Sequence, residues 1–344
     1  MSDRKDRRKE DREAGRKTEK KEPSRAKRLM QRLRHPKTAA WGVAAGTLGG
    51  AAAAASGGAQ PAETPEGAIA FRGPDSVGFR VSSDWDITPA DNEQVNFFKE
   101  FLQWKNRDKT KQWLERLGRY GPMIQQKLAE RDMPQDLLWL ATIESGLDPN
   151  AYSKADAAGI WQFIEETAKR YGLEVSEYVD ERRDPIASTD AALDYLKQLN
   201  ERMGGSWYLA AAGYNTGENR VERIVNEYAG GNFSDETFWN IERFLPSETR
   251  DYVPVMLAMG HIAKDPAKYG FTDLQLQEPY AFKTVRVPGG THLDDVAKQI
   301  GVDPEVLYDL NPHLVKKMTP PDRDWDVRVP PDADTSRVTA ERTA

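Results

Sequence analysis

Residues Met133–Gly146 read MPQDLLWLATIESG and predict a helix that carries an acid on its apolar face. A proline at the second position suits the start of a helix, and the final glycine suits its end. The apolar stripe runs through Leu137, Leu140 and Ala141 to Glu144, at i, i+3, i+4 and i+7. The spacing therefore places this glutamate on the buried side of the last helical turn.

Two effects disfavour the anion of Glu144 at such a position. Burial removes water from the carboxylate, and the C-terminal end of a helix carries a partial negative charge. Both raise its pKa, and a carboxylic acid that stays protonated near neutral pH can act as a general acid. The alternative is a glutamate at the edge of the stripe whose carboxylate reaches solvent, and helical spacing alone favours that alternative.

A second segment, Ser153–Gly172, reads SKADAAGIWQFIEETAKRYG and places a polar amide among apolar side chains. Gln162 lies between Trp161 and Phe163. A buried amide needs hydrogen-bond partners. The N-acetyl and hydroxyl groups of a sugar would supply them, and the protein's own backbone is the common alternative.

Two further segments carry polar groups at helix ends. Trp207–Gly217 reads WYLAAAGYNTG, with Tyr214 and Asn215 closing a helix. The tyrosine hydroxyl could hold a neighbouring carboxylate in position, or the ring could pack in the core while the asparagine caps the helix. Leu245–Val253 reads LPSETRDYV and starts a helix with Glu248 in its first turn, which favours the helix dipole and could be purely structural.

Composition narrows the possible chemistry. The chain has no cysteine, which excludes a disulfide framework, a thiolate zinc site and a cysteine nucleophile. Its four histidines are scattered without metal-ligand spacing. We therefore expect no metal site built on cysteine or histidine.

The N-terminal region differs in charge from the rest of the chain. Residues 1–38 carry 16 Lys/Arg and 7 Asp/Glu, a net +9, which leaves −15 for the remainder of a chain whose total is −6. Residues 39–55 are uncharged and rich in alanine and glycine. A basic region followed by an apolar run is typical of an export signal. A cleaved signal, an uncleaved membrane anchor and a disordered tail of a cytoplasmic protein all remain open, whereas the acidic remainder argues against nucleic acid as a partner.

The rest of the chain divides by pattern. Residues 56–91 are rich in glycine and proline and predict a linker. Residues 92–272 show helix signals without convincing period-two alternation, so we expect an all-helical domain. Among these signals, Asp184 can cap a helix that has Pro185 at its first position. Residues 283–331 predict a strand–helix–helix–strand module, and residues 332–344 a disordered tail. The expected fold class is mainly α with a small α+β module at the C-terminal end.

Three strings in this order resemble the soluble lytic transglycosylase (SLT) domain. They are ESGLDPNAYSKADAAGIWQFIEETAKRYGL, AAGYNTGENRV and LPSETRDYVPVMLA, and DERRDP at 180–185 also fits. Within the family the strings look closest to the membrane-bound lytic murein transglycosylase D group. The resemblance covers about residues 130–265 and implies a lysozyme-like helical fold with a sugar-binding cleft.

The resemblance also implies roles for individual residues. By matching positions, Glu144 is the catalytic acid/base. The substrate-binding positions are Ser153, Gln162, Tyr214, Asn215, Glu248 and Tyr252. Gly213 and Asp156 depart from the residues usual in the family without removing a chemical group.

The implied reaction needs one carboxylate and neither a metal nor a cofactor. It cleaves the β-1,4 bond between N-acetylmuramic acid and N-acetylglucosamine in peptidoglycan glycan strands and forms a 1,6-anhydromuramoyl product. The alternatives are a hydrolytic muramidase of the same fold and a non-catalytic peptidoglycan-binding scaffold. The substrate implies an exported, periplasmic protein of the cell envelope. Residues 39–55 are a possible site of membrane association. We expect the protein to act as a monomer.

The C-terminal module at 283–331 resembles a diverged LysM peptidoglycan-binding domain. The strings VRVPGGTHLDDVAKQIGVDPEVLYDLNP and WDVRVPP carry the match. The usual Gly-Asp-Thr-Leu is replaced by the sequence from Gly290 to Leu293, GTHL. The module is expected either to bind glycan or to serve as a structural cap.

Overall fold

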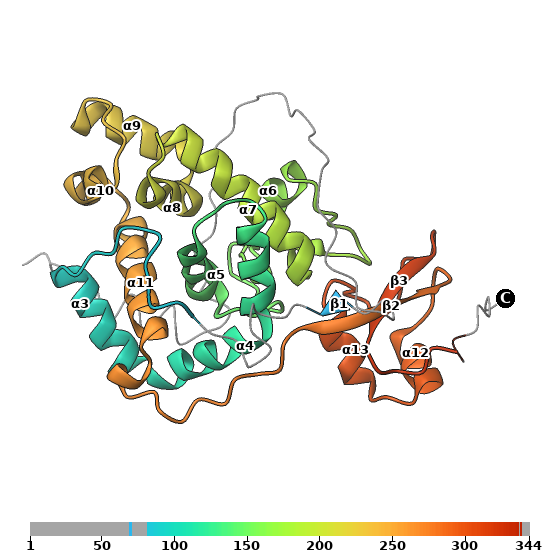
Figure 1. The fold of residues 1–344 in the computed structure, drawn as a ribbon. Coiled ribbons are helices and arrows are strands. Elements are labelled where there is room, and N and C mark those ends of the chain that lie inside the picture. The colour runs from blue at the N-terminus through green and yellow to red at the C-terminus, as the bar shows by residue number, and fades with distance from the viewer. Residues whose placement is uncertain (1–68, 71–80, 337, 339–344) are drawn as a thin grey trace, which may run out of the picture.

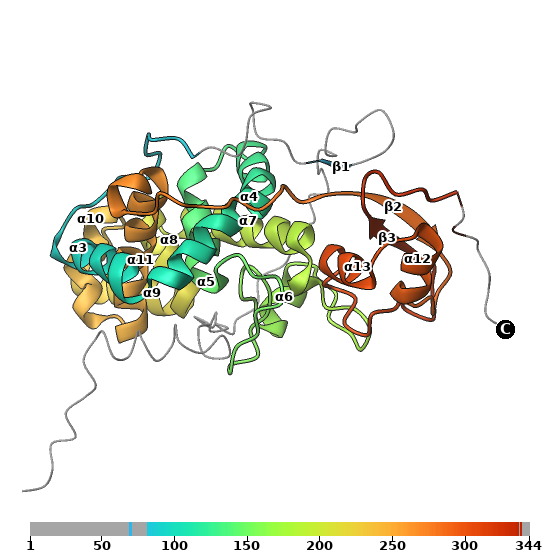
Figure 2. The same cartoon turned by 90° about the horizontal axis from the view of Figure 1, so that it is seen from below.

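The computed structural model describes residues 69–70, 81–336 and 338. The predicted basic region 1–38, the apolar segment 39–55 and most of the 56–91 linker lie outside these residues. The described chain forms a helical body joined to a small α/β module at its C-terminal end (Figure 1 and Figure 2). No helix in this part of the chain is long and apolar enough to cross a bilayer.

The helical body confirms the mainly α fold class. Its α-helices are α3 (Glu93–Glu100), α4 (Arg107–Ala129), α5 (Leu138–Ser145), α6 (Glu165–Arg170), α7 (Pro185–Arg202), α8 (Trp207–Thr216), α9 (Glu218–Ala229), α10 (Asp235–Ile241) and α11 (Ser247–Lys264). Shorter helical turns are η1 (Phe101–Lys105), η2 (Gln135–Leu137), η3 (Glu181–Arg183), η4 (Glu242–Phe244) and η5 (Ala267–Tyr269).

The start of α7 shows how local sequence sets a helix boundary. The Asp184 side chain accepts hydrogen bonds from the backbone N–H groups of Ile186 and Ala187, at 2.8 and 3.2 Å. Pro185 occupies the first helical position, where no N–H is needed. This confirms the predicted cap.

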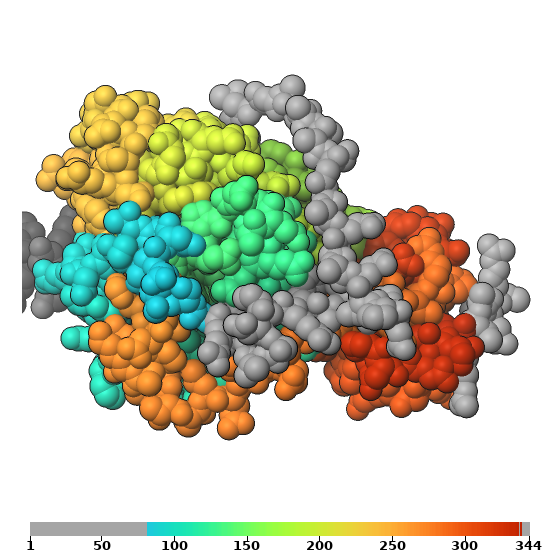
Figure 3. Space-filling model, viewed as in Figure 1, coloured from blue at the N-terminus to red at the C-terminus, as the bar shows by residue number. Residues whose placement is uncertain are grey.

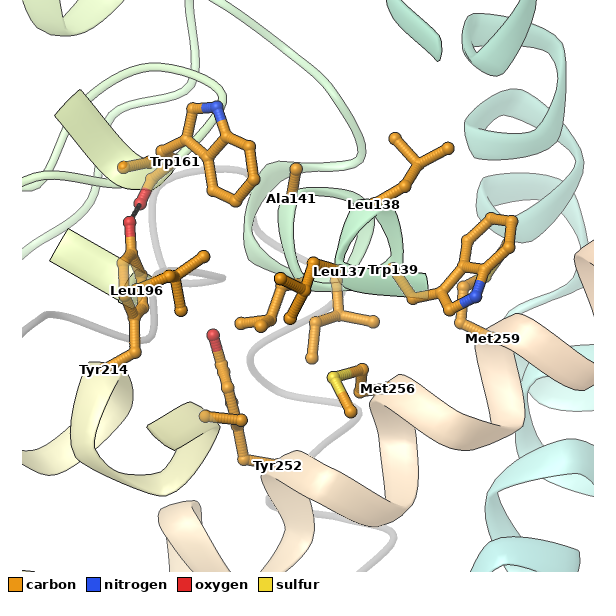
Figure 4. Close-up of a cluster of buried hydrophobic side chains, with 14 of the residues drawn as sticks. Leu137, Leu138, Trp139, Ala141, Trp161, Leu196, Tyr214, Tyr252, Met256 and Met259 are labelled. Atoms are coloured by element: carbon orange, nitrogen blue, oxygen red, sulfur yellow. Dashed lines mark hydrogen bonds between the residues drawn. The ribbon is translucent and has the colours of Figure 1, made fainter. Parts of the chain in front are cut away.

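Helix α11 is central to the packing of the body. It lies against α3, α5 and α8. Figure 4 shows Met256 and Met259 on α11 facing buried side chains of α5 and of the turn η2 before it, among them Trp139 and Leu137. The buried core encloses α5, so a polar group on its inner face is removed from water.

Residues 81–91, predicted as the end of a linker, pack on the helical body. Ile87 is buried, and the Asp86 carboxylate accepts from the backbone N–H groups of Gln135 and Asp136 at 2.5 and 3.0 Å. The Tyr208 hydroxyl donates to the carbonyl of Thr88. We therefore propose that the helical body includes residues 81–91 and does not start at residue 92.

Two truncated chains test this boundary. A chain that starts at residue 92 should unfold with a free energy about 2–4 kcal/mol smaller than one that starts at residue 81, because it loses the burial of Ile87 and the Asp86 hydrogen bonds. Urea unfolding of both chains measures the difference. Equal unfolding midpoints would restore the linker prediction for residues 81–91.

The C-terminal module confirms the predicted strand–helix–helix–strand order. It consists of β2 (Ala281–Val287), α12 (Leu293–Ile300), α13 (Pro304–Leu310) and β3 (Trp325–Val329). Strands β2 and β3 are antiparallel, with Val285 opposite Val327, and β1 (Ile69–Ala70) pairs along the other edge of β2.

Figure 3 shows the module as a lobe at one end of the helical body. The predicted tail 332–344 is wrong at its first residues, because Ala333 is buried in the module core. Its backbone N–H also donates to the carbonyl of Pro330 at 3.1 Å.

Candidate active site

Glu144 lies in the last turn of α5, and its side chain is 1% exposed. The helix ends at Gly146, which has a left-handed backbone with φ 66°. A Cβ at this glycine would lie 2.1 Å from the ring of Trp113, so a larger residue does not fit. Of the two alternatives for Glu144, the structure shows the buried one.

The two oxygens of the Glu144 carboxyl group differ in their hydrogen bonding. The Tyr252 hydroxyl on α11 donates to Oε1 at 2.5 Å. Oε2 is buried and has no hydrogen-bond partner among the residues that the structure describes. A buried polar atom without a protein partner is uncommon in folded proteins and is found where water or a ligand binds or where the group is catalytic.

Burial raises the pKa of Glu144 well above its usual range, which is one of the two alternatives that the sequence left open. The hydrogen bond from Tyr252 acts in the opposite direction, and the nearby Glu248 carboxylate raises the pKa further. Burial has the largest effect, so the carboxyl group keeps its proton at a pH where an exposed glutamate is ionised. A protonated carboxyl group with a free oxygen is suited to general acid catalysis.

The prediction that Tyr214 orients Glu144 is wrong. The Tyr214 hydroxyl donates to the backbone carbonyl of Trp161 at 2.9 Å (Figure 4). The hydroxyl that binds Glu144 belongs to Tyr252, which the family resemblance places at the site without specifying its partner. Both tyrosines are buried, and the packing of α8 and α11 around α5 decides which one reaches the carboxylate.

Ser153 and Gln162 lie in one tightly bonded loop, residues 151–163, which we call the Gln162 loop. The Ser153 Oγ accepts from two backbone N–H groups of the same loop, at 3.1 and 2.9 Å. Gln162 donates from Nε2 to the carbonyls of Gly159 and Ala151, at 2.7 and 3.3 Å. The backbone alternative for the amide of Gln162 is therefore the one observed, and both side chains shape the loop.

The Gln162 loop is attached directly to the end of α5. The Ser145 hydroxyl donates to the carbonyl of Ile160 at 2.8 Å, and Tyr214 binds the next carbonyl in the loop. Sequence reasoning missed Ser145, although it follows Glu144 directly. These two bonds bring the loop beside the last turn of the helix that carries the acid.

Asn215 and Glu248 connect α8 and α11 to the same region. The Asn215 Oδ1 accepts from the Thr249 hydroxyl at 2.7 Å, while its Nδ2 is buried without a partner among the described residues. The helix ends two residues later at Gly217, so Asn215 is not its cap. Glu248 is half-buried in the first turn of α11, and its charge acts on Glu144. Thr249 was not identified from the sequence.

Two other carboxylates near the end of α5 shape loops. Asp148 accepts from the backbone N–H of Asn150 at 2.9 Å and lies 3.4 Å from Arg116. Asp156 has φ 59° and accepts from the Tyr152 hydroxyl at 3.2 Å. Glu248 is the carboxylate whose charge acts on Glu144.

Replacing Glu144 by glutamine should change how stability depends on pH. The folded chain binds this proton more tightly than the unfolded chain, so wild-type stability is complete below the ordinary pKa of 4.5 and falls as pH rises above it. Glutamine does not titrate. The stability of Glu144→Gln relative to wild type should therefore grow by up to about 1.4 kcal/mol per pH unit until the folded pKa is reached.

Urea unfolding of both chains at several pH values above 4.5 measures this difference. If the free energy of unfolding depended on pH in the same way in both chains, the Glu144 pKa would not be raised.

Comparison with known proteins assigns both parts of the chain. Residues 121–236 match the family described as Transglycosylase SLT domain. Residues 281–343 match the family described as Lytic transglycosylase MltD, LysM-like domain. The first match contains the Glu144 helix, the Gln162 loop and the Tyr214 helix.

Individual relatives agree with these matches. Membrane-bound lytic murein transglycosylase D of Escherichia coli is 39% identical over 193 residues, which are 56% of this chain and 42% of that protein. Membrane-bound lytic murein transglycosylase F 2 of Alkalilimnicola ehrlichii is 31% identical over 147 residues, 41% of this chain and 31% of that protein. The chain thus spans less than half the length of these curated relatives.

Among solved structures, the 70 kDa soluble lytic transglycosylase of Escherichia coli aligns with a TM-score of 0.37 and 23% identity. The alignment covers 47% of this chain and 26% of that one. Residues 121–236 of this protein are thus similar to the transglycosylase SLT domain family, and residues 281–343 to the LysM-like domain family of lytic transglycosylase MltD.

Proposed function

We propose that this protein is a peptidoglycan lytic transglycosylase. One observation carries the proposal: within an SLT domain, Glu144 is a buried, protonated carboxyl group with one oxygen held by Tyr252 and the other free for a ligand. The substrate is the β-1,4 bond between N-acetylmuramic acid and N-acetylglucosamine in glycan strands. Peptidoglycan and lytic murein transglycosylase are the terms that describe its relatives.

In the first step Glu144 donates its proton to the oxygen of the glycosidic bond. The bond from the muramoyl C1 to that oxygen breaks, and the N-acetylglucosamine part leaves as an alcohol. The substrate's own N-acetyl group stabilises the positive charge at C1. This step needs an acid that is still protonated near neutral pH, which the burial of Glu144 provides.

In the second step the Glu144 carboxylate takes the proton of the muramoyl C6 hydroxyl. The C6 oxygen then bonds to C1 and closes the 1,6-anhydro ring, which returns Glu144 to its protonated state. The same residue serves as acid and as base, so the reaction requires no second carboxylate and no water. The Tyr252 hydrogen bond favours the ionised form of Glu144 and so stabilises the carboxylate that exists between the two steps.

A second candidate is a hydrolytic muramidase, and the position of Glu248 favours it. A glycosidase that adds water uses two carboxylates. Glu248 is close enough for its charge to act on Glu144. In a hydrolase the carboxylate of Glu248 would activate a water molecule, and the product would carry a reducing end.

Mass spectrometry of the soluble products from purified sacculi separates the candidates. A lytic transglycosylase releases muropeptides that are lighter by one water molecule than the hydrolysed products. Anhydromuropeptides from the wild-type chain, absent with Glu144→Gln, are the expected result. Reducing-end products would favour the muramidase, and binding to sacculi without any release would leave a non-catalytic scaffold.

We further propose that the protein is exported and acts in the periplasm as a monomer. Its substrate lies outside the inner membrane, and residues 39–55 follow a basic region as in an export signal. Residues 1–62 fused to an enzyme that is active only after export should restore its activity, and cytoplasmic retention of the fusion would refute export. N-terminal sequencing of the envelope protein then distinguishes a cleaved signal from a membrane anchor.

A further inference from the structure

The segment 178–184 lies between α6 and α7 of the helical body but is held by the C-terminal module. Val179 is fully buried in the hydrophobic core of the module, together with Val287 and Val327. It also forms an antiparallel bridge with Leu314. A side chain of the helical body thus completes the core of the second lobe.

Backbone hydrogen bonds reinforce this contact on both sides of Val179. The N–H of Asp180 donates to the carbonyl of His313 at 2.9 Å, and the N–H of Val315 donates to the carbonyl of Tyr178 at 3.1 Å. The segment is therefore added to the module as a short extended strand. Such a contact fixes the position of each of its residues to the module.

A buried ion pair closes the end of the same segment. Arg328 on β3 donates to the Asp184 carboxylate at 2.6 Å and to the Tyr280 hydroxyl at 3.1 Å. Burial alone would raise the pKa of Asp184, but the Arg328 guanidinium lowers it to about 2. Separating the two lobes would require both charges to be re-solvated or left unpaired, and an unpaired buried charge is strongly destabilising.

The segment carries Arg182, which is 4% exposed and holds the Gln162 loop. Its Nε and Nη2 donate to the two carboxylate oxygens of Asp180, both at 2.8 Å. Its Nη1 donates to the carbonyls of Asp156 and Phe163, at 2.7 and 3.3 Å. The guanidinium therefore joins two distant points of the loop and is itself held in orientation by Asp180.

The loop also packs directly on the backbone of Arg182. Gly159 has φ 81°, and a Cβ there would lie 1.7 Å from the Arg182 carbonyl oxygen. The next residue, Ile160, is the one whose carbonyl accepts from Ser145 beside Glu144. A continuous series of contacts thus runs from the C-terminal module through Arg182 to the end of α5.

We propose that Arg182 is a positioning residue for the Glu144 site and that the C-terminal module holds it in place through Val179 and Asp180. The catalytic consequence rests on the function proposed above. If the module served only as a tethered glycan-binding unit, it would change the affinity for substrate. A module that positions the Gln162 loop acts on turnover, because misplacing groups around the acid costs rate after binding.

The structural coupling is tested first, by hydrogen exchange of the full chain. Val179→Ala weakens the contact of the segment with the module core. Val296→Ala is the matched control, because Val296 is equally buried in the same core but lies on α12. We expect amides of residues 151–163 to exchange about tenfold faster in Val179→Ala than in wild type, with little change in the control. Unchanged exchange in Val179→Ala, or equal acceleration in both variants, would overturn the coupling.

The catalytic consequence is tested with Arg182→Lys and a soluble tetrasaccharide muropeptide as substrate. Lysine keeps the charge but lacks the planar fork that joins Asp180 to two carbonyls. We expect kcat to fall about tenfold or more with KM changed less than about twofold, at a temperature where the variant is fully folded. A rise in KM at constant kcat, or no change, would refute the positioning role. If the wild-type chain itself cleaves nothing, the proposed function fails, while the exchange experiment still decides the coupling.

Discussion

Glu144→Gln is expected to reduce the release of soluble muropeptides from purified sacculi by about 10²–10⁴-fold or more, to background, while the chain remains folded. Glutamine preserves the shape of the side chain and can still accept the Tyr252 hydrogen bond at Oε1. It cannot donate a proton to the glycosidic oxygen, and it cannot recover one from the C6 hydroxyl. Both proposed steps therefore fail together.

The matched control for this substitution is Glu227→Gln. Glu227 lies on the exposed side of α9, remote from α5. Its replacement by glutamine is the same chemical change as in Glu144→Gln. The control variant should release muropeptides at the wild-type rate. Circular dichroism and the unfolding midpoint establish that both variants are folded. Digestion by Glu144→Gln at a rate near wild type would remove Glu144 from the mechanism.

Tyr252→Phe is expected to lower kcat by about 10²-fold with little change in KM. The hydroxyl of Tyr252 holds Oε1 of Glu144 at 2.5 Å, so its loss frees the carboxyl group to rotate away from the substrate. The same bond lowers the Glu144 pKa, and without it the pKa rises further. The alkaline limb of the profile of kcat/KM against pH should therefore move to higher pH in this variant.

Tyr214→Phe is the matched comparison, because it removes a buried hydroxyl that binds the Trp161 carbonyl instead of Glu144. It should lower stability by about 1–3 kcal/mol, since a buried acceptor loses its partner. We expect a smaller loss of turnover than in Tyr252→Phe and no shift of the alkaline limb. A larger catalytic effect for Tyr214→Phe would assign the orienting role to Tyr214 after all.

Sequence patterns were sufficient for features that depend on neighbours within a few turns. The stripe from Leu137 to Glu144 placed the acid in line with the apolar face of a helix, because helical periodicity sets that face, but only the structure shows that its carboxyl group is buried. The cap at Asp184 followed from a side chain that bonds its own backbone two and three residues on. The order of strands and helices in the C-terminal module followed from the same kind of local signal.

The sequence patterns failed where the partner was distant in the chain. Tyr214 and Tyr252 both end up buried near α5, and no local pattern tells which hydroxyl meets the acid. The bond from Tyr252 to Glu144 spans 108 residues, and the bond from Tyr214 to Trp161 spans 53. The family motifs predicted that both tyrosines lie at the site, but they did not predict which group each hydroxyl binds.

The sequence by itself thus determined the mainly helical class, the division into a helical body and a C-terminal module, and a glutamate in line with the apolar stripe at the end of a helix. The tertiary structure alone decided that Tyr252 holds this glutamate, that Gln162 bonds its own loop, and that Val179 and Arg182 connect the two lobes to that loop. The physical reason is the separation along the chain over which each interaction acts. Periodicity, caps and turns act over a few residues, whereas a hydrogen bond between helices depends on how their packed faces set the distance and angle between two side chains.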